Sequence, residues 1–113
     1  MTVTTTAHRL GPVAEIPHGE GRAYAVGGEQ IAVFHLRSGA VRAVSAVCPH
    51  AGGPLADGQA DERVVVCPLH LATYDLETGR CLSPDRPPIT VYPADVDRDG
   101  DVVVHIPVRT PAG

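Results

Sequence analysis

The chain of 113 residues contains no Lys, no Asn and no Trp, and it has a single Phe. Its core must therefore be built from aliphatic side chains, and Val alone occurs 16 times. Nine Arg residues stand against thirteen acidic residues, which gives a formal net charge of -4. General nucleic-acid or anionic-membrane binding requires a basic footprint that this composition lacks. We expect neither kind of partner.

Long apolar segments are missing as well. The first ten residues hold no apolar core of signal-peptide length, and no stretch approaches the length of a membrane span. The three Cys residues are an odd number, which does not suggest a disulfide scaffold and points instead to metal binding or buried thiols. These observations predict a cytoplasmic protein.

Turn-forming residues are abundant, with 12 Gly and 11 Pro. Together with many β-branched residues they predict short strands and no helix of core length. We expect one all-β domain over residues 1–113, an antiparallel sandwich or small barrel, with loose ends at 1–7 and 107–113. The predicted strands cover residues 10–14, 22–26, 31–37, 41–47, 64–66, 73–76, 80–82, 89–96 and 102–106.

Two short motifs carry residues with metal-binding chemistry. The first is Cys48-Pro49-His50, and the second is Cys67-Pro68-Leu69-His70. Each motif supplies one thiolate and one imidazole from a loop that follows a predicted strand. Thiolates suit iron–sulfur clusters and zinc, and imidazoles suit iron and zinc. Two loops at one end of a sandwich can converge on a single metal centre.

The interleaved order of the ligand types favours iron and sulfide. In a Rieske [2Fe–2S] centre two Cys hold one iron and two His hold the other, so each loop would contact both irons. Gly52 and Gly53 would let backbone amides approach the sulfurs closely. A Cys2His2 zinc finger instead groups its two Cys and places its two His on a helix. A structural zinc module without a redox role remains the alternative from a different class.

Longer segments around these motifs resemble Rieske-type [2Fe–2S] ferredoxins. The resemblance runs from residue 21 to residue 106 and is carried by CPHAGGPLADG, VVVCPLH, TYDLETGRCL and ITVYPADV. It is closest to the small subunit of NAD(P)H nitrite reductases and to the ferredoxin components of ring-hydroxylating dioxygenases. It implies an antiparallel β-sandwich with a small cluster-binding subdomain of two loops at about residues 47–73, and one [2Fe–2S] cluster per chain.

The resemblance also implies roles for individual residues. Cys48 and Cys67 would hold the inner iron, and His50 and His70 the outer iron. The chain would pass single electrons from an NAD(P)H- or flavin-linked reductase to a terminal oxidoreductase, with no turnover of its own. We interpret it first as the small subunit of an assimilatory nitrite reductase, and alternatively as a dioxygenase ferredoxin.

Tyr74 and the two glycines of the first loop are candidates for tuning the potential of the cluster. In respiratory Rieske proteins a Tyr four residues after the second His donates its hydroxyl to the first-loop Cys sulfur, here Cys48. Packing as a core aromatic is an equally weighted interpretation of Tyr74. Cys81 is interpreted as a small buried hydrophobe. The remaining histidines are interpreted as ordinary strand or surface residues: His8, His18, His35 and His105.

Overall fold

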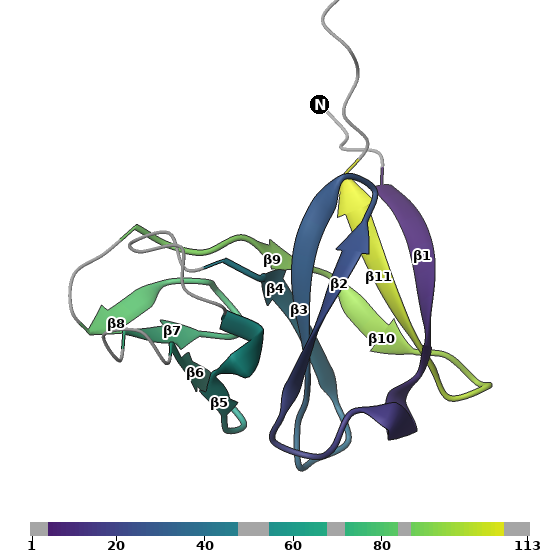
Figure 1. Ribbon diagram of the computed structural model, residues 1–113, viewed down its shortest axis with the longest axis horizontal. Helices are drawn as coiled ribbons and strands as arrows, with labels where there is room; N and C mark the ends of the chain where they lie inside the picture. Colours follow the sequence, from purple (N-terminus) through teal and green to yellow (C-terminus); the bar gives the residue numbers. More distant parts are fainter. Residues whose placement is uncertain (1–4, 48–54, 68–71, 84–86, 108–113) are drawn as a thin grey trace, which may run out of the picture.

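The computed structural model describes residues 5–47, 55–67, 72–83 and 87–107. Figure 1 shows two lobes, with β5 to β8 forming the smaller one. The elements are β1 (Thr5–Pro12), η1 (Val13–Glu15), β2 (Gly21–Val26), β3 (Glu29–His35), β4 (Val41–Ser45), η2 (Leu55–Asp57), β5 (Gln59–Ala60), β6 (Val64–Val66), β7 (Thr73–Asp75), β8 (Cys81–Ser83), β9 (Val91–Tyr92), β10 (Ala94–Val96) and β11 (Asp101–Pro107).

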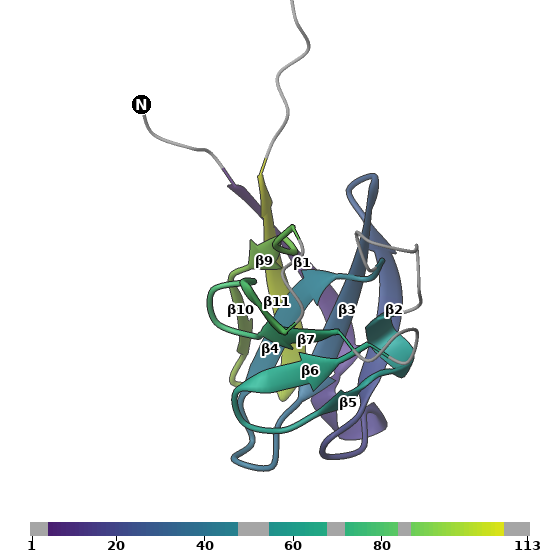
Figure 2. The ribbon, with the colours of Figure 1, turned by 90° about the vertical axis from the view of Figure 1, so that its left-hand side faces the viewer.

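The described strands form three antiparallel sheets. The larger lobe is a sandwich of the sheets β1-β11-β10 and β2-β3-β4-β9, and the smaller lobe is the sheet β5-β6-β7-β8. In Figure 2 the small sheet lies in front of β3 and β4. The fold is all-β and antiparallel, as the sequence predicts.

Strand β3 is buried on both faces, which explains why apolar residues occupy both of its alternating sets. Ile31 and Val33 face the core of the sandwich, where they pack with residues of β4 and β11. Ala32 and Phe34 face the second core, which lies beneath the small lobe. Since successive side chains of a strand point to opposite faces, one strand serves as the wall between two cores.

In three turns an aspartate carboxylate accepts hydrogen bonds from backbone N–H groups that follow it in the chain. The Asp75 carboxylate accepts hydrogen bonds from the backbone N–H groups of Glu77 at 2.8 Å and Thr78 at 2.9 Å. The hydrogen bonds from the backbone of Thr78 and of Glu77 hold the pKa of the Asp75 carboxyl below its ordinary value. Asp61 makes the same pair of bonds, from the residues two and three positions on, whereas Asp97 accepts from the residues two and four positions on. Because the pKa of Asp75 is lower in the folded than in the unfolded chain, its ionised carboxylate stabilises the fold. This stabilisation is fully present above the pKa of the unfolded chain and is lost as the pH falls through the pKa of the folded chain.

His35 lies in β3, in agreement with the interpretation as a strand residue, and it is also buried and extensively bonded. Its Nδ1 lies 2.7 Å from the carbonyl oxygen of Ile16, so that nitrogen carries the proton and donates it. Its backbone N–H donates to Glu20 and its carbonyl accepts from Gly19. The His18 ring stacks on it with centroids 4.0 Å apart. His35 thus ties the segment before β2 to the end of β3.

Two sequence predictions differ from the structure in their boundaries. Residues 5–7 were expected to be loose but belong to β1, because β11 offers them a pairing partner as far as Pro107. The strand predicted for residues 89–96 is divided at Pro93 into β9 and β10, which join different sheets. Proline lacks the N–H that a continuous ladder needs, and its carbonyl instead accepts from His105.

Gly79 offers a test of how closely the small lobe packs against the segment before β9. It has φ +81°, and a Cβ added there would meet the Ile89 carbonyl oxygen. Gly100 has φ +83° with open space around its Cβ position. We expect Gly79→Ala to cost about 1–3 kcal/mol more in urea unfolding than Gly100→Ala, because only the first adds a backbone collision to the shared cost of a left-handed residue. Equal losses of stability would contradict the close approach.

Candidate metal centre

The segment that carries the first motif begins and ends at two residues joined by a backbone hydrogen bond. We call such a joined pair of residues the closed base of a motif. Ala46 directly follows β4, and its carbonyl oxygen accepts a hydrogen bond from the Leu55 N–H at 2.9 Å. The two ends of residues 47–54 are therefore held together by a backbone hydrogen bond. Val47 is exposed and directly precedes Cys48. The described chain resumes in η2, where Leu55 and Ala56 are buried.

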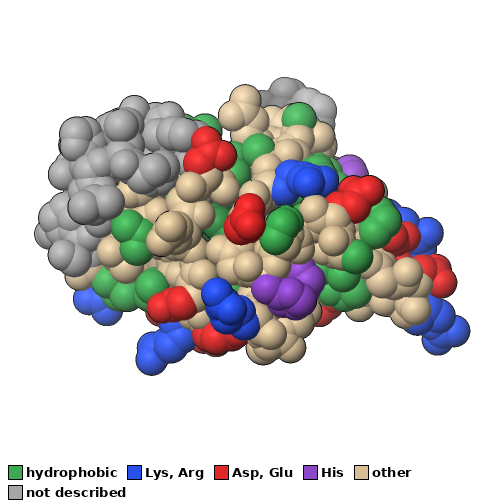
Figure 3. All heavy atoms as spheres, turned by 60° about the horizontal axis from the view of Figure 1, so that its bottom comes forward, with side chains coloured by type: hydrophobic (Ala, Val, Ile, Leu, Met, Phe, Trp, Pro, Cys, Tyr) green, Lys and Arg blue, Asp and Glu red, His purple; other side chains and the backbone are tan. Residues whose placement is uncertain are grey.

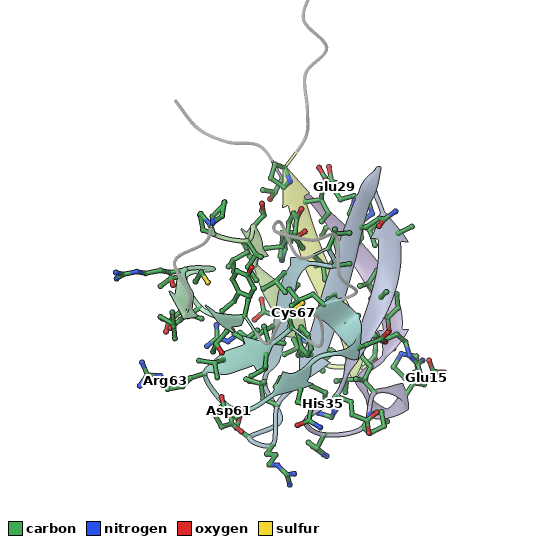
Figure 4. All side chains as sticks on the ribbon, turned by 60° about the vertical axis from the view of Figure 1, so that its left-hand side comes forward. Glu15, Glu29, His35, Asp61, Arg63 and Cys67 are labelled. Atoms are coloured by element: carbon green, nitrogen blue, oxygen red, sulfur yellow. The ribbon has the colours of Figure 1, made fainter. Side chains whose placement is uncertain are left out.

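The second motif has the same kind of base. Strand β6 ends next to Cys67, whose backbone N–H donates to the Ala72 carbonyl oxygen at 2.8 Å. Next to this hydrogen bond, on the side away from the motif, Val66 pairs with Thr73 in the β6–β7 ladder. The Cys67 side chain is fully buried, and Figure 4 shows it beside η2 and β6.

Both bases belong to one buried cluster. Ala46 and Leu55 from the first base, and Cys67 and Ala72 from the second, pack in the same core as Phe34. The fold thus brings together the points from which the two motifs project, as expected for loops that share one metal centre.

Of the predicted ligands, Cys67 is the one that lies within the described residues. Cys48, His50 and His70 lie outside them, as do Gly52 and Gly53. Within the described part of the chain, no three His, Cys, Asp or Glu residues gather where they could hold a metal ion. In that same part, no helix is long and apolar enough to cross a membrane.

Comparison with known families settles what kind of domain this is. A family model of the Rieske [2Fe-2S] domain matches residues 6–93. The chain belongs to this family. A Rieske domain carries one [2Fe–2S] cluster per chain, and the chain is a Rieske electron-transfer ferredoxin. The family match thus favours an iron–sulfur centre over structural zinc.

Individual relatives come from two kinds of redox system. The 3-phenylpropionate/cinnamic acid dioxygenase ferredoxin subunit of Escherichia coli K12 is 34% identical over 102 residues, which cover 88% of this chain and 93% of the relative. A protein assigned as an NADH-dependent nitrite reductase small subunit from Mycobacterium tuberculosis is 27% identical with a TM-score of 0.84, covering 96% of this chain and 99% of that one. A chain in the complex of reduced oxygenase and oxidized ferredoxin in carbazole 1,9a-dioxygenase is 26% identical with a TM-score of 0.75, covering 87% and 91%.

The donor set and its surroundings fit such a cluster. A fully buried thiol at the base of one loop is shielded from water, as a cluster ligand should be, and thiolate with imidazole is the donor combination of the Rieske centre. Cys81 packs against the same core but is partly exposed, so it is less buried than its sequence suggested.

Tyr74 is fully buried in the core that contains Cys67. It lies in β7, opposite Val65 on one side and Cys81 on the other. This location agrees with the packing role. The acceptor expected for its hydroxyl, Cys48, lies outside the described residues, so the tuning role stays a prediction.

We predict that Tyr74→Phe lowers the reduction potential while the cluster content stays the same. A hydroxyl donor stabilises the more negative reduced cluster, and a gain of about 1 kcal/mol on reduction corresponds to about 40 mV for one electron. Protein-film voltammetry measures the shift. Tyr24→Phe, at a partly buried residue that packs against the core of the sandwich, is the control. An unchanged potential in fully loaded Tyr74→Phe protein would leave Tyr74 with the packing role alone.

Proposed function

We propose that Cys48 and Cys67 hold the inner iron of the cluster and that His50 and His70 hold the outer iron. The support is the pairing of one Cys and one His in each motif, and the closed bases of both motifs in one buried core. When bound, the cluster supplies reversible one-electron chemistry. The protein supplies the buried Cys67 and, for each motif, two flanking residues joined by a backbone hydrogen bond.

The proposed role is that of a cytoplasmic carrier that takes electrons from an NAD(P)H- or flavin-linked reductase and delivers them to a terminal oxidoreductase. The sequence similarity to a dioxygenase ferredoxin subunit, over most of both chains, favours a terminal oxygenase as the acceptor. A complex between an oxygenase and a ferredoxin is the setting of one structural relative, which supports direct docking between the two proteins.

The small subunit of a nitrite reductase is the second candidate. It is favoured by the structural match to the Mycobacterium tuberculosis protein, which extends over nearly the full length of both chains. The two candidates differ in a physical property. A carrier must dissociate from its partners between electrons, whereas a subunit stays bound to the large chain of its enzyme.

The two roles are distinguished by purifying an affinity-tagged chromosomal copy of the protein from its own cells. A carrier elutes as a free coloured chain, takes up one electron reversibly, and is reduced by NAD(P)H only when a reductase is added. Stoichiometric recovery with a large flavin- and haem-bearing chain would show the subunit role instead. A protein that takes up no electron at all would overturn both candidates.

A further inference from the structure

Gly58 lies between the closed bases of the two motifs. It directly follows η2, which begins at Leu55, one of the two residues of the first base. The Gly58 N–H donates to the Leu55 carbonyl oxygen at 2.9 Å. Gly58 also faces the carbonyl oxygen of Val66, the last residue of β6, which directly precedes Cys67. A short backbone path thus links the base of the first motif to a proposed ligand of the second.

The approach of Gly58 to Val66 leaves no room for a side chain. A Cβ added at Gly58 would collide with the Val66 carbonyl oxygen. It would also lie 3.0 Å from the Leu55 carbonyl oxygen and 3.2 Å from the Cγ2 methyl of Val65. The backbone of Gly58 does not have the positive φ that is found at Gly79. Glycine is therefore required at this position by the close contact and not by a left-handed conformation.

A second glycine contacts η2 from the sandwich. Gly21, the first residue of β2, lies so close to η2 that a Cβ added there would be 2.9 Å from the Ala56 carbonyl oxygen. In Figure 1 the short helix η2 lies between the small sheet and strands β2 and β3. Because η2 packs against both lobes, it has little freedom to move away from a side chain introduced at Gly58.

We propose that Gly58 is a positioning residue for the cluster, because the close contact that it permits between η2 and β6 sets the distance from the first base to Cys67. The inference deepens the proposed function and rests on its ligands, since the first motif would supply Cys48 and His50 to the cluster that Cys67 also binds. Metal–ligand distances vary by only about 0.2 Å, so a cluster held by both motifs fits a narrow range of spacings between their bases.

The contact at Gly58 is uncharged. The three atoms nearest to an added Cβ are two backbone oxygens and one methyl carbon, and Gly58 itself is buried. On the face drawn in Figure 3, by contrast, acidic and basic side chains are interspersed. Replacing Gly58 by Ala changes no charge of the protein. An altered property of the cluster in this variant would therefore report the spacing of the bases and not a changed electrostatic field.

The test compares Gly58→Ala with Gly79→Ala in the full chain loaded with its cluster. Gly79 is the matched control because a Cβ there also meets a backbone carbonyl oxygen, that of Ile89, whereas Gly79 lies in the turn after Asp75, at the end of β7 away from the second motif. Release of the cluster to excess EDTA is followed by the loss of visible absorbance. We expect release to be about tenfold faster from Gly58→Ala than from the wild type, because the crowded bases hold the cluster less well. Gly79→Ala should stay close to the wild-type rate, although urea unfolding should show that both variants are destabilised.

Electron paramagnetic resonance of the reduced cluster separates positioning from a general loss of stability. A changed spacing of the bases should alter the g values of Gly58→Ala, whereas Gly79→Ala should keep those of the wild type. Wild-type g values in loaded Gly58→Ala protein would overturn the positioning role and leave the proposed ligands intact. A wild-type chain without iron and sulfide would overturn the proposed function, and the positioning role with it.

Val65→Ala tests the same contact in case Gly58→Ala does not fold. It removes the buried methyl group beside Gly58 and so loosens the packing of η2 on β6, which Gly58→Ala crowds. Val104→Ala, at an equally buried residue in the core of the sandwich, is its control. Altered g values and faster cluster release in Val65→Ala alone would support the positioning role. The same g values in both valine variants and the wild type would overturn it.

Discussion

The burial of β3 on both faces is the constraint on which the rest of the structure depends. Ile31 and Val33 complete the core of the sandwich, while Ala32 and Phe34 complete the core under the small lobe. Full burial of a side chain such as that of Phe34 contributes about 1.5–3 kcal/mol. Because one short strand serves both cores, the small sheet is fixed against the sandwich by packing. Gly21 permits this packing, since a Cβ there would collide with the Phe34 ring.

This arrangement fixes the residues that flank the two motifs. Each loop begins and ends in the core beneath the small lobe, and each base is closed by one backbone hydrogen bond. The aspartates of the neighbouring turns, Asp61 and Asp75, hold the β6–β7 hairpin at its other end. The core beneath the small lobe thus fixes both ends of each motif segment. Fixed ends of this kind suit the proposed electron carrier, because little structural change should accompany the gain or loss of an electron.

Much of this organisation could be predicted from the sequence. The many turn formers and β-branched residues predicted short antiparallel strands, and the predicted strand at residues 31–37 corresponds to β3. The break at Pro93 was missed because alternation continues across it, and only the pairing partners show that two sheets are involved. The burial of His35 was missed because its partner, the Ile16 carbonyl, is a backbone group that no side-chain pattern reveals.

The central claim is that one His from each loop binds the same cluster. Electron–nuclear double resonance on the reduced protein, grown with ¹⁵N-labelled histidine, tests it most directly. Our account predicts two strongly coupled histidine nitrogens, and the loss of one of them in a His70→Cys protein that keeps its cluster. A reduced cluster with no histidine nitrogen coupling would show that His50 and His70 are not its ligands, and would contradict the account.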